Sequence, residues 1–232
     1  MKDVLEAGLR QMGLPTEGIP SLLRYAQLLV ETNQVMNLTA ITEPKEIARL
    51  HFLDSAALLT LADFRGKTVA DVGTGAGFPG LPLRIVEPSI QLTLLDALNK
   101  RVTFLQQVCE ELGLSDVDCV HARAEEFAAD HRESFDLVTS RAVASLPLLS
   151  ELCLPLVKLG GTFLPMKSVD SDEELAAAKG AIALLGGEID TVQDYQIPGT
   201  EIRHRLVLIR KVRETPKKYP RAFAKIKKNP LS

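Results

Sequence analysis

The 232-residue chain has few of the residues that build disulfide frameworks and metal centres. Its three cysteines, Cys109, Cys119 and Cys153, show no C-x-x-C spacing, and an odd number cannot all pair within one chain. Its four histidines are scattered and form no ligand motif. These scarcities argue against a disulfide scaffold and give a metal centre no support. They favour reduced thiols in the cytosol.

Targeting signals and long apolar runs are missing as well. The first six residues carry acids where a secretory signal would have a basic flank and an apolar core. The most apolar region, residues 145–165, is interrupted by charges, glycines and prolines. A membrane span needs roughly 20 consecutive apolar residues. We therefore expect a cytoplasmic protein without a membrane anchor.

What the chain does contain is a glycine-rich loop directly after a strand-like run. Residues 67–72 lead into the sequence GTGAGFPG at 73–80. Alternate glycines permit a tight turn and close approach of a ligand, and the helix that follows would direct free N–H groups at that ligand. With Asp71 in the acidic position, the pattern acid-x-G-x-G-x-G is typical of S-adenosylmethionine sites. The glycines at 75, 77 and 80 also match the dinucleotide spacing, and a turn without a ligand is a third interpretation.

The apolar periodicity predicts helices first and then an alternation of strands and helices. Expected helices cover residues 3–12, 21–34, 44–61, 99–112, 146–158 and 172–185. Expected strands cover residues 68–72, 91–96, 118–122, 135–140, 161–167, 189–197 and 203–210. Alternating strands and helices imply right-handed crossovers and a mostly parallel sheet covered on both faces, closed by a final antiparallel hairpin. We thus expect an α/β doubly wound, seven-stranded fold with a helical extension (1–65), a sheet domain (66–212) and a basic C-terminal tail (213–232).

A doubly wound sheet binds its ligand beyond the carboxyl ends of its strands, where the winding reverses. Asp96 ends the second strand, 23 residues after Gly73, where a carboxylate can accept hydrogen bonds from ribose hydroxyls. An acid at this position suits either cofactor. The third strand is followed by Arg-Ala-Glu-Glu at 123–126, whose acids also suit an ordinary helix start.

Charge is distributed unevenly along the chain. From Arg203 onward there are eleven Lys or Arg and one acid, a net charge of +10, whereas residues 1–202 carry −13. Such a basic end on an acidic body is typical of proteins that bind polyanions, although a merely solvated terminus is the alternative.

Three groups of residues together resemble the bacterial small-subunit ribosomal RNA guanine-N7 methyltransferase family, also called glucose-inhibited division protein B. They are VADVGTGAGFPGLP at 69–82, LLD at 94–96 with KRVTFL at 100–105, and SRAVASL at 140–146. The similarity extends to MNLTA at 36–40, HFLDS at 51–55, Gly160, Gly161 and Lys167, and TPKKYPR at 215–221, so that it covers nearly the whole chain. After Arg221 the chain departs from the family pattern, which often has a glycine and a proline there.

The resemblance implies a Rossmann-like class I methyltransferase fold with S-adenosylmethionine as the cofactor and small-subunit ribosomal RNA, free or in a particle, as the partner. Its motifs place the cofactor against Gly73, Gly75, Phe78, Asp96, Ala124, Glu125 and Arg141. A core position is the alternative for Phe78. Arg141 follows a buried strand and needs an anionic partner, which the cofactor carboxylate or an RNA phosphate would supply.

Nitrogen-7 of guanine has a free lone pair, so no general base is expected, and positioning supplies the acceleration. Arg141 is the positioning candidate. The candidates for RNA contacts are Lys100, Arg101, Lys167, Lys217, Lys218 and Arg221, although a solvated helix face also explains the first two. His51 and Asp54 are three residues apart and could attach the extension to the sheet. We expect a monomer.

Two other classes of protein stay open at this point. A methyltransferase for a small molecule or a protein would not need the basic C-terminal segment. A dinucleotide-binding protein would use the second glycine spacing and prefer NAD.

Overall fold

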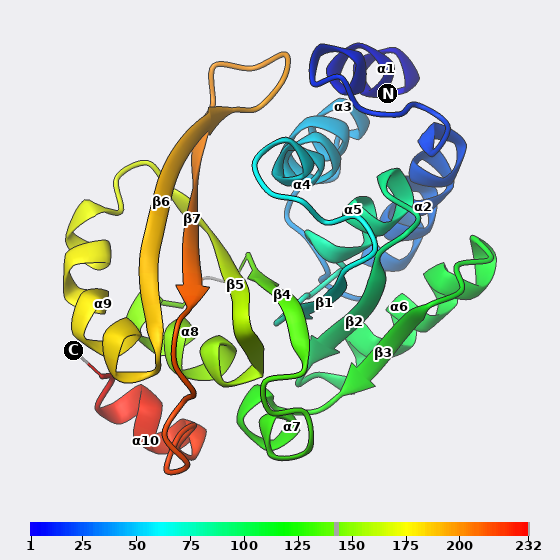
Figure 1. Ribbon diagram of the computed structural model, residues 1–232. Coiled ribbons are helices and arrows are strands. Elements are labelled where there is room, and N and C mark those ends of the chain that lie inside the picture. The colour runs from blue at the N-terminus through cyan, green and yellow to red at the C-terminus, as the bar shows by residue number, and fades with distance from the viewer. Residues whose placement is uncertain (142–143, 232) are drawn as a thin grey trace.

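The computed structural model describes residues 1–141 and 144–231, which contain one seven-stranded sheet (Figure 1). The strands are β1 (Thr68–Val72), β2 (Gln91–Asp96), β3 (Val117–His121), β4 (Phe135–Ser140), β5 (Val157–Ser168), β6 (Gly187–Gln196) and β7 (Arg203–Lys211). Their order in space is β3-β2-β1-β4-β5-β7-β6, and β7 runs antiparallel to both of its neighbours. β1 to β5 pair in parallel. The predicted doubly wound, mostly parallel sheet is confirmed.

Successive residues of the central strands face opposite sides of the sheet, as the two-residue period of a strand requires. Leu94 packs in one hydrophobic cluster and Leu95 in the other. The first cluster joins the sheet to the N-terminal helices and to α5 (Gly80–Val86) and α6 (Asn99–Glu111). The second joins it to α7 (Ala124–Asp130), α8 (Leu146–Cys153) and α9 (Asp172–Leu184). Both faces of the sheet are therefore covered.

The N-terminal helices are α1 (Lys2–Gln11) and α2 (Ile19–Asn33), followed by a segment that differs from the prediction. The single helix expected over 44–61 is divided into α3 (Pro44–Ile47), the π-helix η1 (Ala48–Leu53), α4 (Asp54–Ala56) and the 3-10 helix η2 (Ala57–Thr60). Residues 51–58 are all buried, and the Ser55 hydroxyl donates to the His51 carbonyl at 2.6 Å. Such a bond to the carbonyl four residues earlier competes with regular helix geometry. None of the described helices is long and apolar enough to cross a membrane.

The helix expected over 146–158 is also shorter than predicted. α8 ends at Cys153, a 3-10 turn η3 (Leu154–Leu156) follows, and β5 already begins at Val157. Pro155 has no N–H group with which to continue a helix. Nearly all of this stretch is buried, so apolar periodicity could not separate the end of the helix from the start of the strand.

The C-terminal segment is packed against the rest of the molecule. After β7 the chain crosses to α8 and ends in α10 (Phe223–Lys228), which lies below α8 in Figure 1. Thr215, Tyr219 and Ile226 are buried, the last two within the second hydrophobic cluster. The expectation of a separate basic tail therefore needs correction, because this segment closes part of the core.

Candidate functional site

The glycine loop is built around a buried carboxylate at the end of β1. Asp71 is fully buried, and its Oδ2 accepts hydrogen bonds from the Thr74 hydroxyl at 2.6 Å and from the Gly80 N–H, at the start of α5, at 2.9 Å. Burial raises the pKa of the Asp71 carboxyl to about 6. Asp71, the acid of the predicted cofactor motif, therefore fixes the conformation of the loop from inside the protein.

The glycines of the loop divide into two kinds. Gly75 has a φ of +62°, and a Cβ built on it meets nothing within 4 Å. Gly77 has a φ of +106°, and its Cβ would lie 2.5 Å from the Tyr25 hydroxyl, inside the protein. The loop therefore offers open backbone at Gly75, whereas Gly77 is required for packing. Gly73, with a φ of +70°, comes directly after β1.

Asp96 stands at the end of β2 beside this loop. It is 4% exposed, and its Oδ2 accepts from the Gly75 N–H at 2.9 Å while Oδ1 accepts from the Leu98 N–H at 2.9 Å. Arg101 approaches Oδ2 at 3.4 Å. The carboxylate thus ties the glycine loop to the next strand, and Arg101, expected as a contact for RNA, faces this acid.

A cavity of about 200 Å³ opens beside these strand ends. Gly73, Asp96, Ala124 and Glu125 all line it, so the structure brings together these four predicted residues. Ligand pockets usually measure about 300 to 1,000 Å³, so this cavity suits one part of a cofactor, such as a nucleoside. The open backbone at Gly75 and the acid beside it fit the adenosyl end of S-adenosylmethionine.

The sequence did not single out one wall of this cavity, which is Phe223 of α10. The Arg123 guanidinium lies over the Phe223 ring at 4.4 Å from its centroid, and the Arg123 Nε donates to Glu125 at 2.7 Å. Phe223 is 143 positions or more from the glycine loop and stands where the chain departs from the family pattern. No local pattern could have placed it here.

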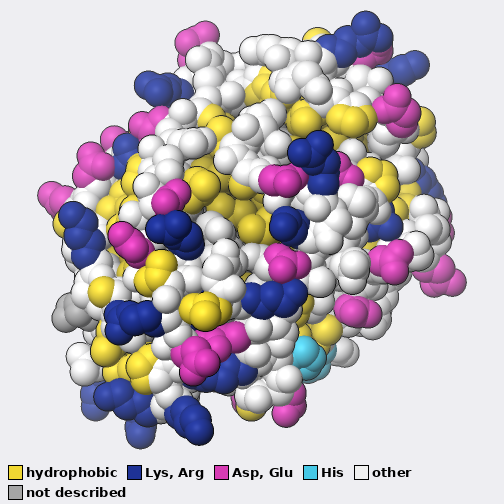
Figure 2. All heavy atoms as spheres, in the orientation of Figure 1, with side chains coloured by type: hydrophobic (Ala, Val, Ile, Leu, Met, Phe, Trp, Pro, Cys, Tyr) yellow, Lys and Arg dark blue, Asp and Glu magenta, His cyan; other side chains and the backbone are white. Residues whose placement is uncertain are grey.

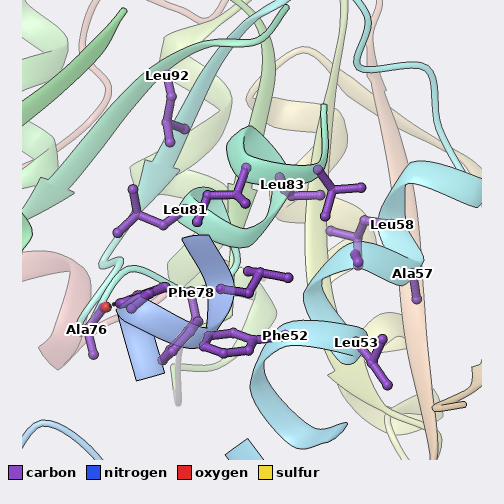
Figure 3. Packing of buried hydrophobic residues seen from close by; sticks show 14 of the residues in the cluster. Phe52, Leu53, Ala57, Leu58, Ala76, Phe78, Leu81, Leu83 and Leu92 are labelled. Carbon is purple, nitrogen blue, oxygen red and sulfur yellow. Dashed lines mark hydrogen bonds between the residues drawn. The ribbon is translucent and has the colours of Figure 1, made fainter. Parts of the chain in front are cut away.

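The Phe78 side chain lies away from this cavity. It is 5% exposed and packs in the first hydrophobic cluster, where Figure 3 shows its ring between Ala76 and Phe52. The His51 ring stacks on it with centroids 4.3 Å apart, and Tyr25 lies on it at 5.6 Å. The core position that the sequence left as the alternative is the one the structure shows for this side chain.

Arg141 has partners within the protein, which corrects the expectation that the cofactor or a phosphate would supply its anion. Its Nη1 donates to the Leu50 carbonyl at 2.9 Å and to Asp54 Oδ2 at 3.2 Å. Its Nη2 donates to His51 Nδ1 at 2.9 Å, and its guanidinium lies 4.9 Å from the Phe78 ring centroid. Ala142 and Val143, the next residues of that motif, lie outside the described residues.

Asp54 is the centre of this network and is fully buried. Its Oδ1 accepts from the Tyr195 hydroxyl and from His204 Nδ1, both at 2.8 Å. Through one carboxylate the extension therefore contacts β6, β7 and the residue that follows β4. The hydrogen bond with Asp54 raises the pKa of His204. The attachment role expected of His51 and Asp54 is confirmed by these contacts.

His51 is held neutral in this network. Burial and then Arg141 lower its pKa to about 3. Since arginine only donates, His51 Nδ1 accepts, and its Nε2 then donates to Thr39 Oγ1 at 2.9 Å. The network therefore fixes one tautomer of the ring.

The cations expected to contact RNA occupy different environments. Lys100, Lys217 and Lys218 are exposed. Lys167 is bound to Glu174 and Ala144, and Arg221 binds the buried carboxylate of Glu151. Arg221 therefore holds the C-terminal segment in place, which corrects its expected role on the surface.

The strand order separates two classes of nucleotide-binding fold. The dinucleotide fold runs 3-2-1-4-5-6 with parallel strands, whereas here an antiparallel strand stands between the fifth and sixth. This topology, with the cavity at the ends of β1 and β2, defines a class I S-adenosylmethionine-dependent methyltransferase. A family model described as rRNA small subunit methyltransferase G (GidB) matches residues 18–204, and the chain belongs to this family.

Relatives support this assignment over the full length. The chain is 46% identical to a protein of Acetivibrio thermocellus named ribosomal RNA small subunit methyltransferase G, over 95% of this chain and 92% of that protein. A protein of the same name from Alkaliphilus metalliredigens is 45% identical over 99% and 98%. Among solved structures, TrmN from Thermus thermophilus has a TM-score of 0.54 at 22% identity, over 68% of this chain and 48% of that one. TYW2 from M. jannaschii in complex with AdoMet has a TM-score of 0.54 at 12% identity, over 68% and 74%.

Proposed function

We propose that this protein transfers a methyl group from S-adenosylmethionine to nitrogen-7 of a guanine in small-subunit ribosomal RNA. The main structural support is the cavity at the ends of β1 and β2, which Gly73, Asp96 and Glu125 all line. Family membership supports the RNA as the substrate, because the relatives' name specifies it. The motif resemblance supports nitrogen-7 as the acceptor atom. Such a substrate is met in the cytoplasm, where we place the protein.

The residues at the site bind and orient, and none is needed as a base. When bound, S-adenosylmethionine would supply an electrophilic methyl group. The N7 lone pair forms the new bond to the methyl carbon, and the electron pair of the broken sulfur–carbon bond stays on sulfur. Asp96 would hold the ribose, and the open backbone at Gly75 would let the cofactor approach closely. Because N7 carries no proton, the acceptor needs no deprotonation. Alignment alone can contribute roughly 7 to 11 kcal/mol to lowering a barrier.

An exposed basic surface supports a nucleic acid partner. Figure 2 shows Lys and Arg side chains gathered at the lower left, over α10, whose lysines are Lys225, Lys227 and Lys228. All three are exposed, as are Lys217 and Lys218 on the preceding turn. α10 also contributes Phe223 to the cofactor cavity, so this surface borders the site. Phosphate contacts from such a surface give affinity without reading a sequence.

Calorimetric titration of the protein with S-adenosylmethionine and with NAD tests the cofactor assignment. We expect saturable binding of S-adenosylmethionine and of its demethylated product, and none of NAD. The opposite preference would identify a dinucleotide-binding protein. Methyl transfer to a free metabolite or a protein, with none to RNA, would instead identify the other kind of methyltransferase.

A further inference from the structure

A second and larger cavity lies at the other side of the β1 end. It measures about 550 Å³, within the usual range of about 300 to 1,000 Å³ for ligand pockets. It is formed by the ends of β4 and β5 and by the start of β7. Its lining includes Arg141, Ser145, Met166, Lys167, Glu174 and His204.

The two cavities flank one pair of bonded strands. β1 and β4 are neighbours in the sheet, and the Ser140 hydroxyl donates to the Val72 carbonyl at 2.9 Å. Gly73, directly after Val72, lines the smaller cavity, and Arg141, directly after Ser140, lines the larger one. A group transferred from a cofactor in the first cavity would therefore pass to an acceptor in the second.

A nearly buried ion pair forms part of the wall of the larger cavity. The Lys167 ammonium donates to Glu174 Oε1 at 2.6 Å and to the Ala144 carbonyl at 2.7 Å. The Lys167 side chain is 8% exposed and that of Glu174 is 28% exposed. Glu174 Oε1 also accepts from the Leu146 N–H at the start of α8.

Among the described residues, the hydrogen bonds of this pair leave one donor proton and one acceptor oxygen unused. An ammonium group has three protons, and the described residues take two of those on Lys167. Their contacts with Glu174 engage Oε1 and leave Oε2 available. A donor and an acceptor thus stand side by side in one cavity, fixed by their own contacts.

We propose that this cavity receives the acceptor guanine and that Lys167 and Glu174 read its Watson–Crick edge, an inference that rests on the proposed function. Guanine presents the O6 acceptor beside the N1–H and N2–H donors. The Lys167 ammonium would donate to O6, and Glu174 Oε2 would accept from both N1–H and N2–H. Adenine presents a donor and an acceptor in the reverse order, so both contacts would fail. The pair therefore selects guanine over adenine.

This orientation leaves the reacting atom free. N7 lies on the edge of the purine opposite to N2, so a base held by its Watson–Crick edge keeps the N7 lone pair unobstructed. Methylation at N7 places positive charge on the base and makes N1–H a stronger donor. The contact with Glu174 thus strengthens as the reaction proceeds, which is the condition for a contact to accelerate the chemical step.

The test compares Glu174→Gln with Glu173→Gln, its exposed neighbour on α9. The substrate is small-subunit RNA transcribed without modifications, with radiolabelled S-adenosylmethionine. Glu174→Gln should lower kcat/KM for RNA about 10- to 100-fold, the range that one good contact to a base edge supplies. Its affinity for S-adenosylmethionine should match the parent, and Glu173→Gln should behave as the parent. A Glu174→Gln variant as active as the parent would overturn the proposal.

A second measurement separates base reading from the structural contact of Glu174 with α8. The guanine that the parent methylates is replaced by inosine, which lacks the N2 amino group. The parent should lose activity on this RNA, whereas Glu174→Gln should be nearly indifferent to the change. If the loss of activity caused by inosine and the loss caused by Glu174→Gln are additive in free energy, the Lys167–Glu174 pair only holds α8 in place. That result would overturn the proposal. Should Glu174→Gln not fold, Lys167→Met with 6-thioguanine, a weaker acceptor than O6, gives the same comparison.

Failure of the proposed function would look different. A parent protein that binds the cofactor but labels no RNA would refute the function itself. Active parent protein with unaffected Glu174 and Lys167 variants would refute only the assignment of this cavity.

Discussion

Replacing Arg221 with alanine tests whether the C-terminal segment belongs to the fold and to the cofactor site. The Arg221 guanidinium donates to both oxygens of Glu151, at 2.8 and 2.6 Å, and its backbone N–H donates to the same carboxylate at 2.9 Å. Glu151 is fully buried. Breaking a buried pair costs about 3 to 5 kcal/mol, and we expect about 3 because 22% of the Arg221 side chain is exposed. In a protein of this size that corresponds to a loss of roughly 6 to 12 °C in Tm.

The assay is thermal unfolding together with calorimetric titration of S-adenosylmethionine. Arg221→Ala should lower Tm and also weaken the binding of S-adenosylmethionine, since it loosens the segment that carries Phe223. Phe223→Ala should lower the affinity for S-adenosylmethionine about 10-fold, with little change in Tm. This is the size of effect seen when an aromatic side chain that stacks on a base is removed. The matched control is Lys218→Ala, which removes an exposed charge from the same segment. Parent-like Tm and affinity in Arg221→Ala would show that the Arg221–Glu151 pair neither stabilises the fold nor supports the cofactor site.

Three further predictions concern the other parts of the site. His51→Asn should reduce the loss of stability on acidification, measured as the free energy of unfolding in urea titrations at several pH values. In the parent, the unfolded chain binds one proton more at His51 than the native state does between pH 6.5 and about 3. The parent therefore loses roughly 1.4 kcal/mol of unfolding free energy per pH unit in this range, and the variant lacks this contribution. Asp96→Asn should raise the calorimetric Kd of S-adenosylmethionine about 10- to 100-fold, for a lost charge-assisted bond of about 1.5 to 3 kcal/mol. Replacing Lys225, Lys227 and Lys228 by alanine should reduce the salt slope of RNA binding by about 2, at roughly 0.7 per phosphate contact on a single strand.

Each of these has a result that would count against it. An unchanged acid slope in His51→Asn would show that the native state does not lower the pKa of this ring. Asp118→Asn, an exposed acid on β3, is the control for Asp96, and equal affinities in the two variants would remove Asp96 from the cofactor site. A triple lysine variant with the parent salt slope would leave RNA recognition to other surfaces.

Local patterns predicted the parts of the fold and site that depend on local sequence. The strands before Gly73 and after it carry apolar residues with clear boundaries, and Asp96 ends its strand where a ribose acid is expected. The glycine loop could be placed because its turn needs glycine at fixed spacing. These features are encoded within a few residues of one another, so the chain order is enough to find them.

Other parts depend on contacts between distant segments, which no local pattern records. Asp54 and Arg141 are 87 residues apart, and their pairing decides that Arg141 has a protein partner. Phe223 lines the proposed cofactor cavity through the C-terminal segment, which the sequence presents only as basic. The lysine and arginine count there could not show that Arg221 is bound to a buried acid while Lys217 stays exposed.

Digestion of methylated RNA to nucleosides identifies the atom and the base to which this protein transfers the methyl group. The protein is incubated with unmodified small-subunit RNA, or with small-subunit particles that lack the modification, and with labelled S-adenosylmethionine. We expect the label to elute as 7-methylguanosine and to map to one position. Label in any other nucleoside, or none in RNA from a protein that binds the cofactor, would contradict it.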